Sequence, residues 1–174
     1  MFPSYLREKV QDLLVLCWTF RVPVLQRASP AHLVADLLYK TLGDKVTQYY
    51  YVDFCAGGGG PTPTIEQALN KRILKSSHKS NTNAQPNSVT NHSVAQFILT
   101  DLHPNIPTWT KAAKRSSNIS FVSESVDATN APVDLYGNNE KKIFRLYNLS
   151  FHHFDDRLGS SLLRDTLEKS NGFG

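Results

Sequence analysis

YYYVDFCAGGGGP, residues 49–61, joins an apolar run to one acidic residue and four consecutive glycines. Tyr49 to Val52 predict a buried strand, and Asp53 lies where that strand leaves the sheet. Gly57 to Gly60 allow the backbone to turn sharply and to approach a ligand without a Cβ in the way. The following pattern, PTPTIEQALNKRIL, predicts a helix with Thr62 as its cap. The order strand, glycine turn and helix predicts an α/β unit that binds a nucleotide-like ligand.

The glycine spacing separates the possible nucleotide sites. A dinucleotide fingerprint, G-x-G-x-x-G, needs a third glycine where this chain has Thr62 or Pro63, which weakens that interpretation. A Walker loop ends in Gly-Lys-Ser or Gly-Lys-Thr, but Gly60 is followed by Pro61, so a Walker loop is excluded.

The segment from Asp53 to Gly59 reads acid, apolar, small, small, then Gly-x-Gly, and it resembles motif I of the class I S-adenosylmethionine-dependent methyltransferases. The resemblance implies a Rossmann-like parallel sheet and S-adenosylmethionine as the cofactor. It also implies that the glycine loop packs against the methionine part, with Asp53 near the cofactor's ammonium group. The family more often has glycine where this chain has Cys55, a residue that favours negative φ, so we expect the loop to differ there.

A second acid follows a second strand pattern. Residues 94–100, VAQFILT, predict a strand that ends at Asp101, and the resemblance implies that this acid binds both ribose hydroxyls. Asp101 lies about twice as far from the glycines as the usual ~20 residues. Residues 76–93 are almost wholly polar, and a disordered insertion over these residues would account for the extra separation.

A third acid, Asp127, follows a short predicted strand at residues 119–122. By resemblance, Asp127 accepts the adenine amino group, and Val126 and Ala128 flank the ring, while Glu124 is a competing candidate. The cofactor-binding residues implied by the resemblance are Asp53, Cys55, Ala56, Gly57, Gly58, Gly59, Asp101, Leu102, Asp127, Ala128 and Asn148.

Residues 142–156, KIFRLYNLSFHHFDD, form a second dense cluster of polar and aromatic side chains. Ile143 to Leu149 predict a fourth strand, and Asn148, His152 and His153 fall near its carboxyl end, where open α/β sheets bind ligands. These three residues are candidates for catalysis, although the sequence assigns no catalytic role. The other histidines and both cysteines are scattered, so no metal site is predicted. A helix with several leucines on one face is expected after Asp155 or Asp156.

The division of the chain into two parts follows from the helical patterns that precede residue 47. Residues 1–46 predict two helices that act as a lid or brace, and residues 47–174 predict a partial methyltransferase-like domain. The resembled fold has seven strands, of which this sequence supplies candidates for strands one to four. An exposed edge on the fourth strand would then favour self-association.

Composition gives broad limits on function. The chain has 174 residues, 40% of them hydrophobic, and a formal net charge of +4, which fits a globular domain. Its basic residues are spread out, so there is no clear nucleic-acid signature, and no apolar segment is long enough for a membrane span. Two cysteines without an export signal predict a cytoplasmic or nuclear location.

Three functions are compatible with these patterns. S-adenosylmethionine-dependent methyl transfer is the leading interpretation, with a small-molecule acceptor favoured. The alternatives are an NAD(P)-dependent oxidoreductase and a truncated, catalytically silent methyltransferase homologue that acts as a binding module.

Overall fold

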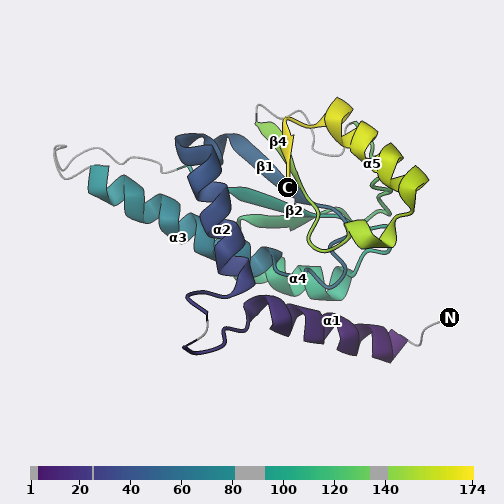
Figure 1. Cartoon of the computed structure of the whole chain (residues 1–174), viewed down its shortest axis with the longest axis horizontal. Helices are drawn as coiled ribbons and strands as arrows, with labels where there is room; N and C mark the ends of the chain where they lie inside the picture. The colour runs from purple at the N-terminus through teal and green to yellow at the C-terminus, as the bar shows by residue number, and fades with distance from the viewer. Residues whose placement is uncertain (1–3, 25, 81–92, 134–140) are drawn as a thin grey trace.

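A computed structural model describes residues 4–24, 26–80, 93–133 and 141–174 and has a Rossmann-like α/β fold. Five parallel strands form one sheet in the order β3-β2-β1-β4-β5, with helices packed against it (Figure 1). The strands are β1 (Tyr49–Asp53), β2 (Gln96–Leu99), β3 (Ile119–Phe121), β4 (Lys142–Leu146) and β5 (Gly172–Phe173). The helices are α1 (Ser4–Thr19), α2 (Pro30–Leu42), α3 (Thr62–Ser80), α4 (Ile106–Arg115) and α5 (Asp156–Lys169), with 3₁₀ turns η1 (Gly43–Gln48) and η3 (Phe151–His153).

Alternate residues of the sheet enter two separate hydrophobic cores, as the period of a strand requires. In β1, Tyr51 packs in a core with side chains of α2, α3 and α4, whereas its neighbour Val52 packs in a second core with Leu162 of α5. Phe97 and Ile98 of β2 divide in the same way. The sheet is therefore buried on both sides, which explains why its central strands are apolar throughout.

The predicted helix after the glycines is confirmed, and it is longer than expected. Ile65, Leu69 and Ile73 of α3 are buried in the first core. Residues 76–80, which we predicted to be disordered, instead continue α3, so that part of the prediction is wrong. Polar residues can extend a helix once it is nucleated, because each added residue costs little. Residues 81–92 of the predicted insertion lie outside the described residues.

The predicted limit of four strands is also wrong. Gly172 and Phe173 form a fifth strand beside Phe144 and Arg145 of β4, so the edge of β4 expected to be exposed is covered over these residues. A Cβ on Gly172 would come within 2.9 Å of the Phe144 ring, which explains why glycine occupies the pairing position. The strand was missed because two residues are too few to show a period.

A buried charge pair fixes α5 to the sheet. Arg145 of β4 is fully buried, donates to Asp165 Oδ2 over 2.8 Å, and lies 4.7 Å from the centre of the Phe54 ring. Lys169 forms a second ion pair with Asp165 and donates to the Ala131 carbonyl over 2.7 Å. The network therefore holds α5 against β4, immediately before the segment that carries Asn148.

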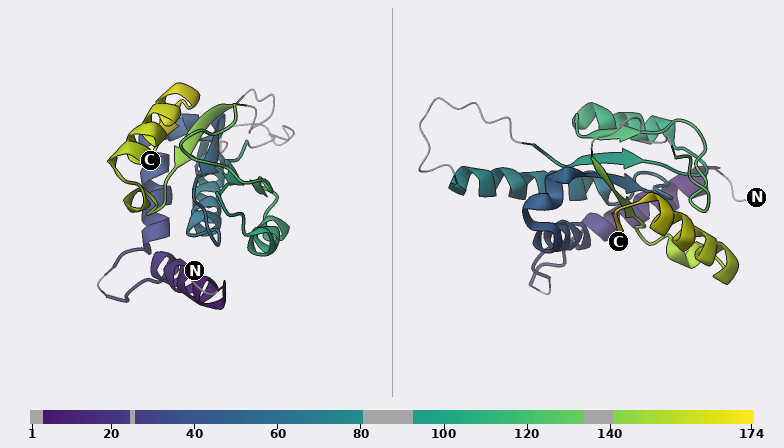
Figure 2. Two further views of the ribbon diagram at one scale, coloured as in Figure 1. Left: turned by 90° about the vertical axis from the view of Figure 1, so that its right-hand side faces the viewer. Right: turned by 90° about the horizontal axis from the view of Figure 1, so that it is seen from above.

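The N-terminal helix α1 lies at the side of the molecule, below α2 in the view of Figure 1 and in the left view of Figure 2. Its most extensive contact with another element is with α2. None of the described helices combines the length and the apolar character that a bilayer-spanning segment needs.

Candidate functional site

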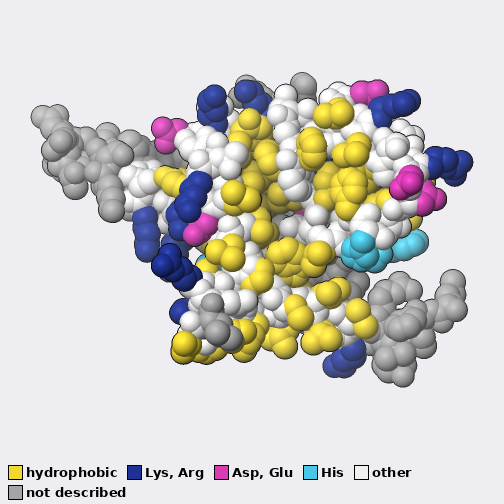
Figure 3. Space-filling model, in the orientation of Figure 1, with side chains coloured by type: hydrophobic (Ala, Val, Ile, Leu, Met, Phe, Trp, Pro, Cys, Tyr) yellow, Lys and Arg dark blue, Asp and Glu magenta, His cyan; other side chains and the backbone are white. Residues whose placement is uncertain are grey.

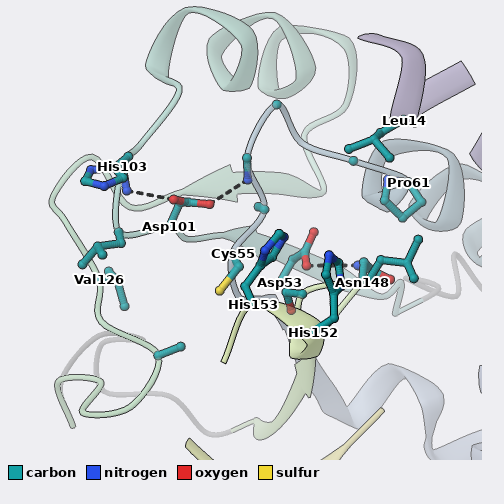
Figure 4. A pocket seen from close by; sticks show the side chains of 18 of the residues that line it. Leu14, Asp53, Cys55, Pro61, Asp101, His103, Val126, Asn148, His152 and His153 are labelled. Carbon is teal, nitrogen blue, oxygen red and sulfur yellow. Dashed lines mark hydrogen bonds between the residues drawn. The ribbon is translucent and has the colours of Figure 1, made fainter. Parts of the chain in front are cut away.

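A pocket of about 800 Å³ opens at the carboxyl ends of the central strands (Figure 4). The chain passes from β1 outward to β2 and β3, then returns to the other side of β1 as β4. Loops that leave β1 and β4 therefore diverge, and this reversal is where open α/β sheets bind ligands. The predicted residues that line the pocket are Asp53, Cys55, Ala56, Gly57, Gly58, Asp101, Leu102, Asp127, Ala128, Asn148, His152 and His153.

The glycine loop runs along the pocket with three glycines at positive φ. Gly57 has a φ of 53°, its N–H donates to Asp101 Oδ2 over 2.8 Å, and its carbonyl accepts from Trp109 Nε1 over 3.0 Å. Gly59 is the one predicted residue outside the pocket lining. A Cβ built on Gly59 would lie 3.9 Å from the Trp109 ring, which is an ordinary contact, so it is the φ of 93° that favours glycine here.

The expectation that Cys55 would change the shape of the loop is wrong, because the residue adopts the positive φ that glycine favours. Its φ is 59°, in the left-handed region that costs an L-residue other than glycine about 1–2 kcal/mol. Burial raises the pKa of the Cys55 thiol to about 12, and the nearby carboxylates of Asp101 and Asp53 add to the shift. Cys55 is therefore a neutral thiol at physiological pH and a poor nucleophile.

Asp53 is buried, with 1% of its surface exposed, and it has a polar partner on each oxygen. Thr62 Oγ1 donates to Oδ2 over 2.6 Å, and Asn148 Nδ2 donates to Oδ1 over 3.0 Å. Thr62 thus binds a carboxylate rather than acting as the simple helix cap we predicted. Burial raises the pKa of Asp53 to about 7, and Asp101 contributes to the rise, while the two hydrogen bonds oppose it. Asp53 therefore changes its charge near neutral pH.

Asp101 connects the loops after β1 and β2. Besides the Gly57 N–H, its carboxylate accepts the His103 N–H at Oδ1 over 2.8 Å. Each carboxylate oxygen has a second lone pair, so Asp101 can still accept two hydroxyl groups. The Asp101 carbonyl also accepts the Val126 N–H over 2.9 Å, which holds the third loop beside the second.

The loop after β3 brings Asp127 to the pocket and leaves Glu124 outside it. Val126 and Ala128 are buried next to Asp127, while Asp127 Oδ1 accepts the N–H and hydroxyl of Thr129. Glu124 is exposed, is bonded to the Ser123 hydroxyl and does not line the pocket. Of the two candidate acids, Asp127 is therefore the one that lines the pocket, and its role in binding adenine stays a prediction.

The segment after β4 closes the opposite side of the pocket. β4 ends at Leu146 rather than at Leu149 as predicted, and Leu149 itself has a φ of 56°, which an extended strand does not allow. His152 and His153 follow in η3 with ring centres 3.9 Å apart, and both side chains are exposed. In Figure 4 both rings lie over the space beside Asp53. The candidate catalytic residues are thus brought together at the pocket, on one segment.

Three lining residues come from α1, namely Val10, Leu14 and Trp18. They lie on one face of the helix, at intervals of four residues, and the sequence gave no sign that this face lines the pocket. Trp109 was also missed, because a buried tryptophan on an amphipathic helix gives no sign of its hydrogen-bond partner. The predicted lid or brace is consistent with this placement, although its movement stays a prediction.

Within the described parts of the chain, no three side chains of His, Cys, Asp or Glu are grouped so that they could hold a metal ion. Neither a scan against protein-family models nor a search of curated proteins found a match to this chain.

Proposed function

We propose that this chain binds S-adenosylmethionine and transfers its methyl group to a small molecule. The observation that supports this proposal best is the meeting of three carboxylates, each following a different parallel strand, around one glycine loop. Asp53, Asp101 and Asp127 all line the same pocket. An elongated ligand with a cationic end, a diol and an aromatic amine would have an acceptor for each of these groups.

The residues present fit such a cofactor. Gly57 and Gly58 offer backbone without a side chain, and Asp101 keeps lone pairs for the ribose hydroxyls. Val126 and Ala128 provide an apolar surface for a base next to Asp127. Asp53 is held by Thr62 and Asn148, and a nearby ammonium group would favour its ionised form, because opposite charges stabilise each other in a buried site.

S-adenosylmethionine supplies, when bound, a methyl group on a positively charged sulfur. In the transfer, the carbon–sulfur bond breaks with its electron pair left on sulfur, and a lone pair of the acceptor forms the new bond to carbon. The chain's main contribution is to align the acceptor in a pocket from which water is excluded. If the acceptor loses a proton, His152 and His153 are bases at the right place, and a catalytic role for either histidine or for Asn148 stays a prediction.

The deciding experiment is calorimetric titration of the folded chain with S-adenosylhomocysteine and, separately, with NAD⁺. We expect binding of S-adenosylhomocysteine and much weaker binding of NAD⁺. Gly57→Val should weaken S-adenosylhomocysteine at least tenfold, because overlap of this kind costs about 1–3 kcal/mol. Gly43→Val is the matched control, since Gly43 has the same positive φ of 53° and a Cβ there meets no atom within 4 Å. Preferential binding of NAD⁺, or unchanged affinity in a folded Gly57→Val protein, would overturn the proposal.

A methyl-transfer assay separates an active enzyme from a silent homologue. Transfer of labelled methyl groups to any member of a panel of small acceptors supports catalysis. Cofactor binding without transfer to any acceptor would favour the binding-module alternative.

A further inference from the structure

The pocket has two ends of different chemistry. In Figure 4, Asp101, His103 and Val126 lie at one end, and Leu14, Pro61, Asn148 and His152 lie at the other. The first end carries the carboxylates and backbone groups proposed above for the cofactor. The second end is bounded by Val10, Leu14 and Trp18 of α1, and we call it the α1 end. A volume of about 800 Å³ is in the upper part of the range for ligand pockets, so a second molecule has room beside the first.

Charge limits what the α1 end can hold. Among the described residues that line the pocket there is no lysine or arginine, whereas three aspartates line it. An anionic ligand of the α1 end would lose its hydration without a lysine or arginine of the lining to replace it, which is costly. The nearest acid, Asp53, is buried and already bonded to Thr62 and Asn148, so it is a poor partner for a second cation. A ligand of the α1 end should therefore be uncharged.

The shape of the walls favours a flat ring system. Trp18 of α1 lines the pocket together with the paired rings of His152 and His153. Aromatic faces pack well against other rings, and Leu14 and Val10 add aliphatic surface. Figure 3 shows that hydrophobic side chains also gather over the α1 region on the outside of the molecule. A test must therefore distinguish the pocket face of α1 from its outer face.

We propose that the α1 end binds an uncharged aromatic molecule between α1 and residues 148–154. This binding site is inferred from the set of residues that line it, whatever the function of the chain. Its identification with the methyl acceptor rests on the proposed function. The site commits the enzyme to an aromatic acceptor and disfavours phosphorylated, carboxylated or nucleic-acid substrates, which carry negative charge.

The test uses 2-naphthol as the uncharged ligand and naphthalene-2-sulfonate as its anionic counterpart, both titrated against the full chain in the presence of S-adenosylhomocysteine. We expect 2-naphthol to bind at least tenfold more tightly than the sulfonate. Leu14→Ser should weaken 2-naphthol at least fivefold, and Val10→Ser should act in the same direction. Leu16→Ser should leave it unchanged, because Leu16 does not line the pocket and lies about 200° around the helix from Leu14.

Leu14 and Leu16 make a matched pair, since 47% and 55% of their surfaces are exposed. Equal weakening by Leu14→Ser and Leu16→Ser would mean adsorption to the outer surface of α1 and would overturn the inference. Equal or tighter binding of the sulfonate would overturn the requirement for an uncharged ligand. Circular dichroism of each variant checks that the fold is kept.

The outcomes separate this inference from the proposed function. If S-adenosylhomocysteine binds and 2-naphthol does not, the aromatic site is wrong and the cofactor assignment stands. If 2-naphthol binds with the expected variant pattern but S-adenosylhomocysteine does not, the aromatic site stands and the methyltransferase proposal fails.

Discussion

The two walls of the pocket are held in place in different ways. The wall that follows β1, β2 and β4 is tied to a parallel sheet, and the Thr100 N–H donates to the Asp53 carbonyl over 2.9 Å directly below the pocket. The α1 wall packs mainly on α2, and its pocket residues Val10 and Leu14 are about half exposed. We infer from this difference that the sheet wall is formed before a ligand binds, whereas the α1 wall would gain packing from a bound ligand. We therefore expect specificity for the cofactor on the first wall and adaptation to the acceptor on the second.

The largest expected effect concerns the buried ion pair between Arg145 and Asp165, which attaches α5 to the sheet. Asp165→Ala should destabilise the protein by about 3–5 kcal/mol, because it leaves the buried Arg145 guanidinium without its carboxylate. Asp36→Ala breaks a more exposed pair with Arg72 and should cost less than about 1 kcal/mol. Urea unfolding measures both. A similar small loss for the two variants would show that the buried pair does not fix α5.

The next effect tests Asp101 as the junction of the sheet wall. Asp101→Ala removes the acceptor of the Gly57 and His103 N–H groups as well as the proposed ribose contact. We expect S-adenosylhomocysteine to bind about 1.5–3 kcal/mol more weakly, together with a measurable loss of thermal stability without ligand. Glu124→Ala, which changes an acid outside the pocket, is the control and should bind normally. Unchanged affinity in Asp101→Ala would leave the residue with a structural role alone.

A smaller effect concerns the charge of Asp53. Because burial raises its pKa from 3.8 to about 7, the folded protein keeps a proton that the unfolded chain releases. The stabilisation that protonated Asp53 contributes is therefore fully present below about pH 4 and is lost as the pH rises through 7. The free energy of unfolding changes over this range by at most about 1.4 kcal/mol per pH unit. Asp53→Asn should flatten the stability profile between pH 5 and 7 on the order of this slope. An unaltered profile would contradict a raised pKa.

The smallest effect tests strain in the glycine loop. Cys55→Gly should stabilise the protein by up to about 1 kcal/mol, because glycine adopts positive φ without a Cβ clash, although it also makes the unfolded chain more flexible. Leu149→Gly provides a comparison, because Leu149 also lines the pocket and, like Cys55, has a positive φ without being glycine. Differential scanning calorimetry measures both changes. A clear loss of stability in Cys55→Gly would show that packing of the thiol outweighs the strain.

The sequence predicts the fold well where the local residue pattern and the position of a segment in the sheet indicate the same structure. Strand ends at Asp53, close to Asp101 and close to Asn148 were recognisable because apolar runs stop there, although β2 ends at Leu99, two residues before the predicted end. Parallel strands bring these carboxyl ends to one edge of the sheet. The grouping of Gly57, Gly58 and the three aspartates in one pocket follows from that geometry. The cofactor and the reaction were inferred from resemblance, and they remain predictions.

The parts that sequence missed depend on contacts between distant segments. Nothing in the pattern of α1 indicated that Leu14 would face the pocket, since that depends on how α1 packs on α2. Gly172 and Phe173 became a strand only through pairing with β4. The continuation of α3 over residues 76–80 was missed because polar composition was read as disorder, although a helix that is already formed can include such residues.

The two cysteines of the chain offer a way to observe the α1 wall in real time. Cys17 is exposed on α1, next to the pocket residue Trp18, while Cys55 lies in the pocket with its pKa raised to about 12 by burial. Thiol-reactive dyes attack the thiolate, so labelling should be selective for Cys17 without any substitution. A fluorophore there would be carried by the helix itself, and its emission would report whether α1 moves when 2-naphthol enters. The native chain thus contains a single attachment point on the element whose mobility is in question.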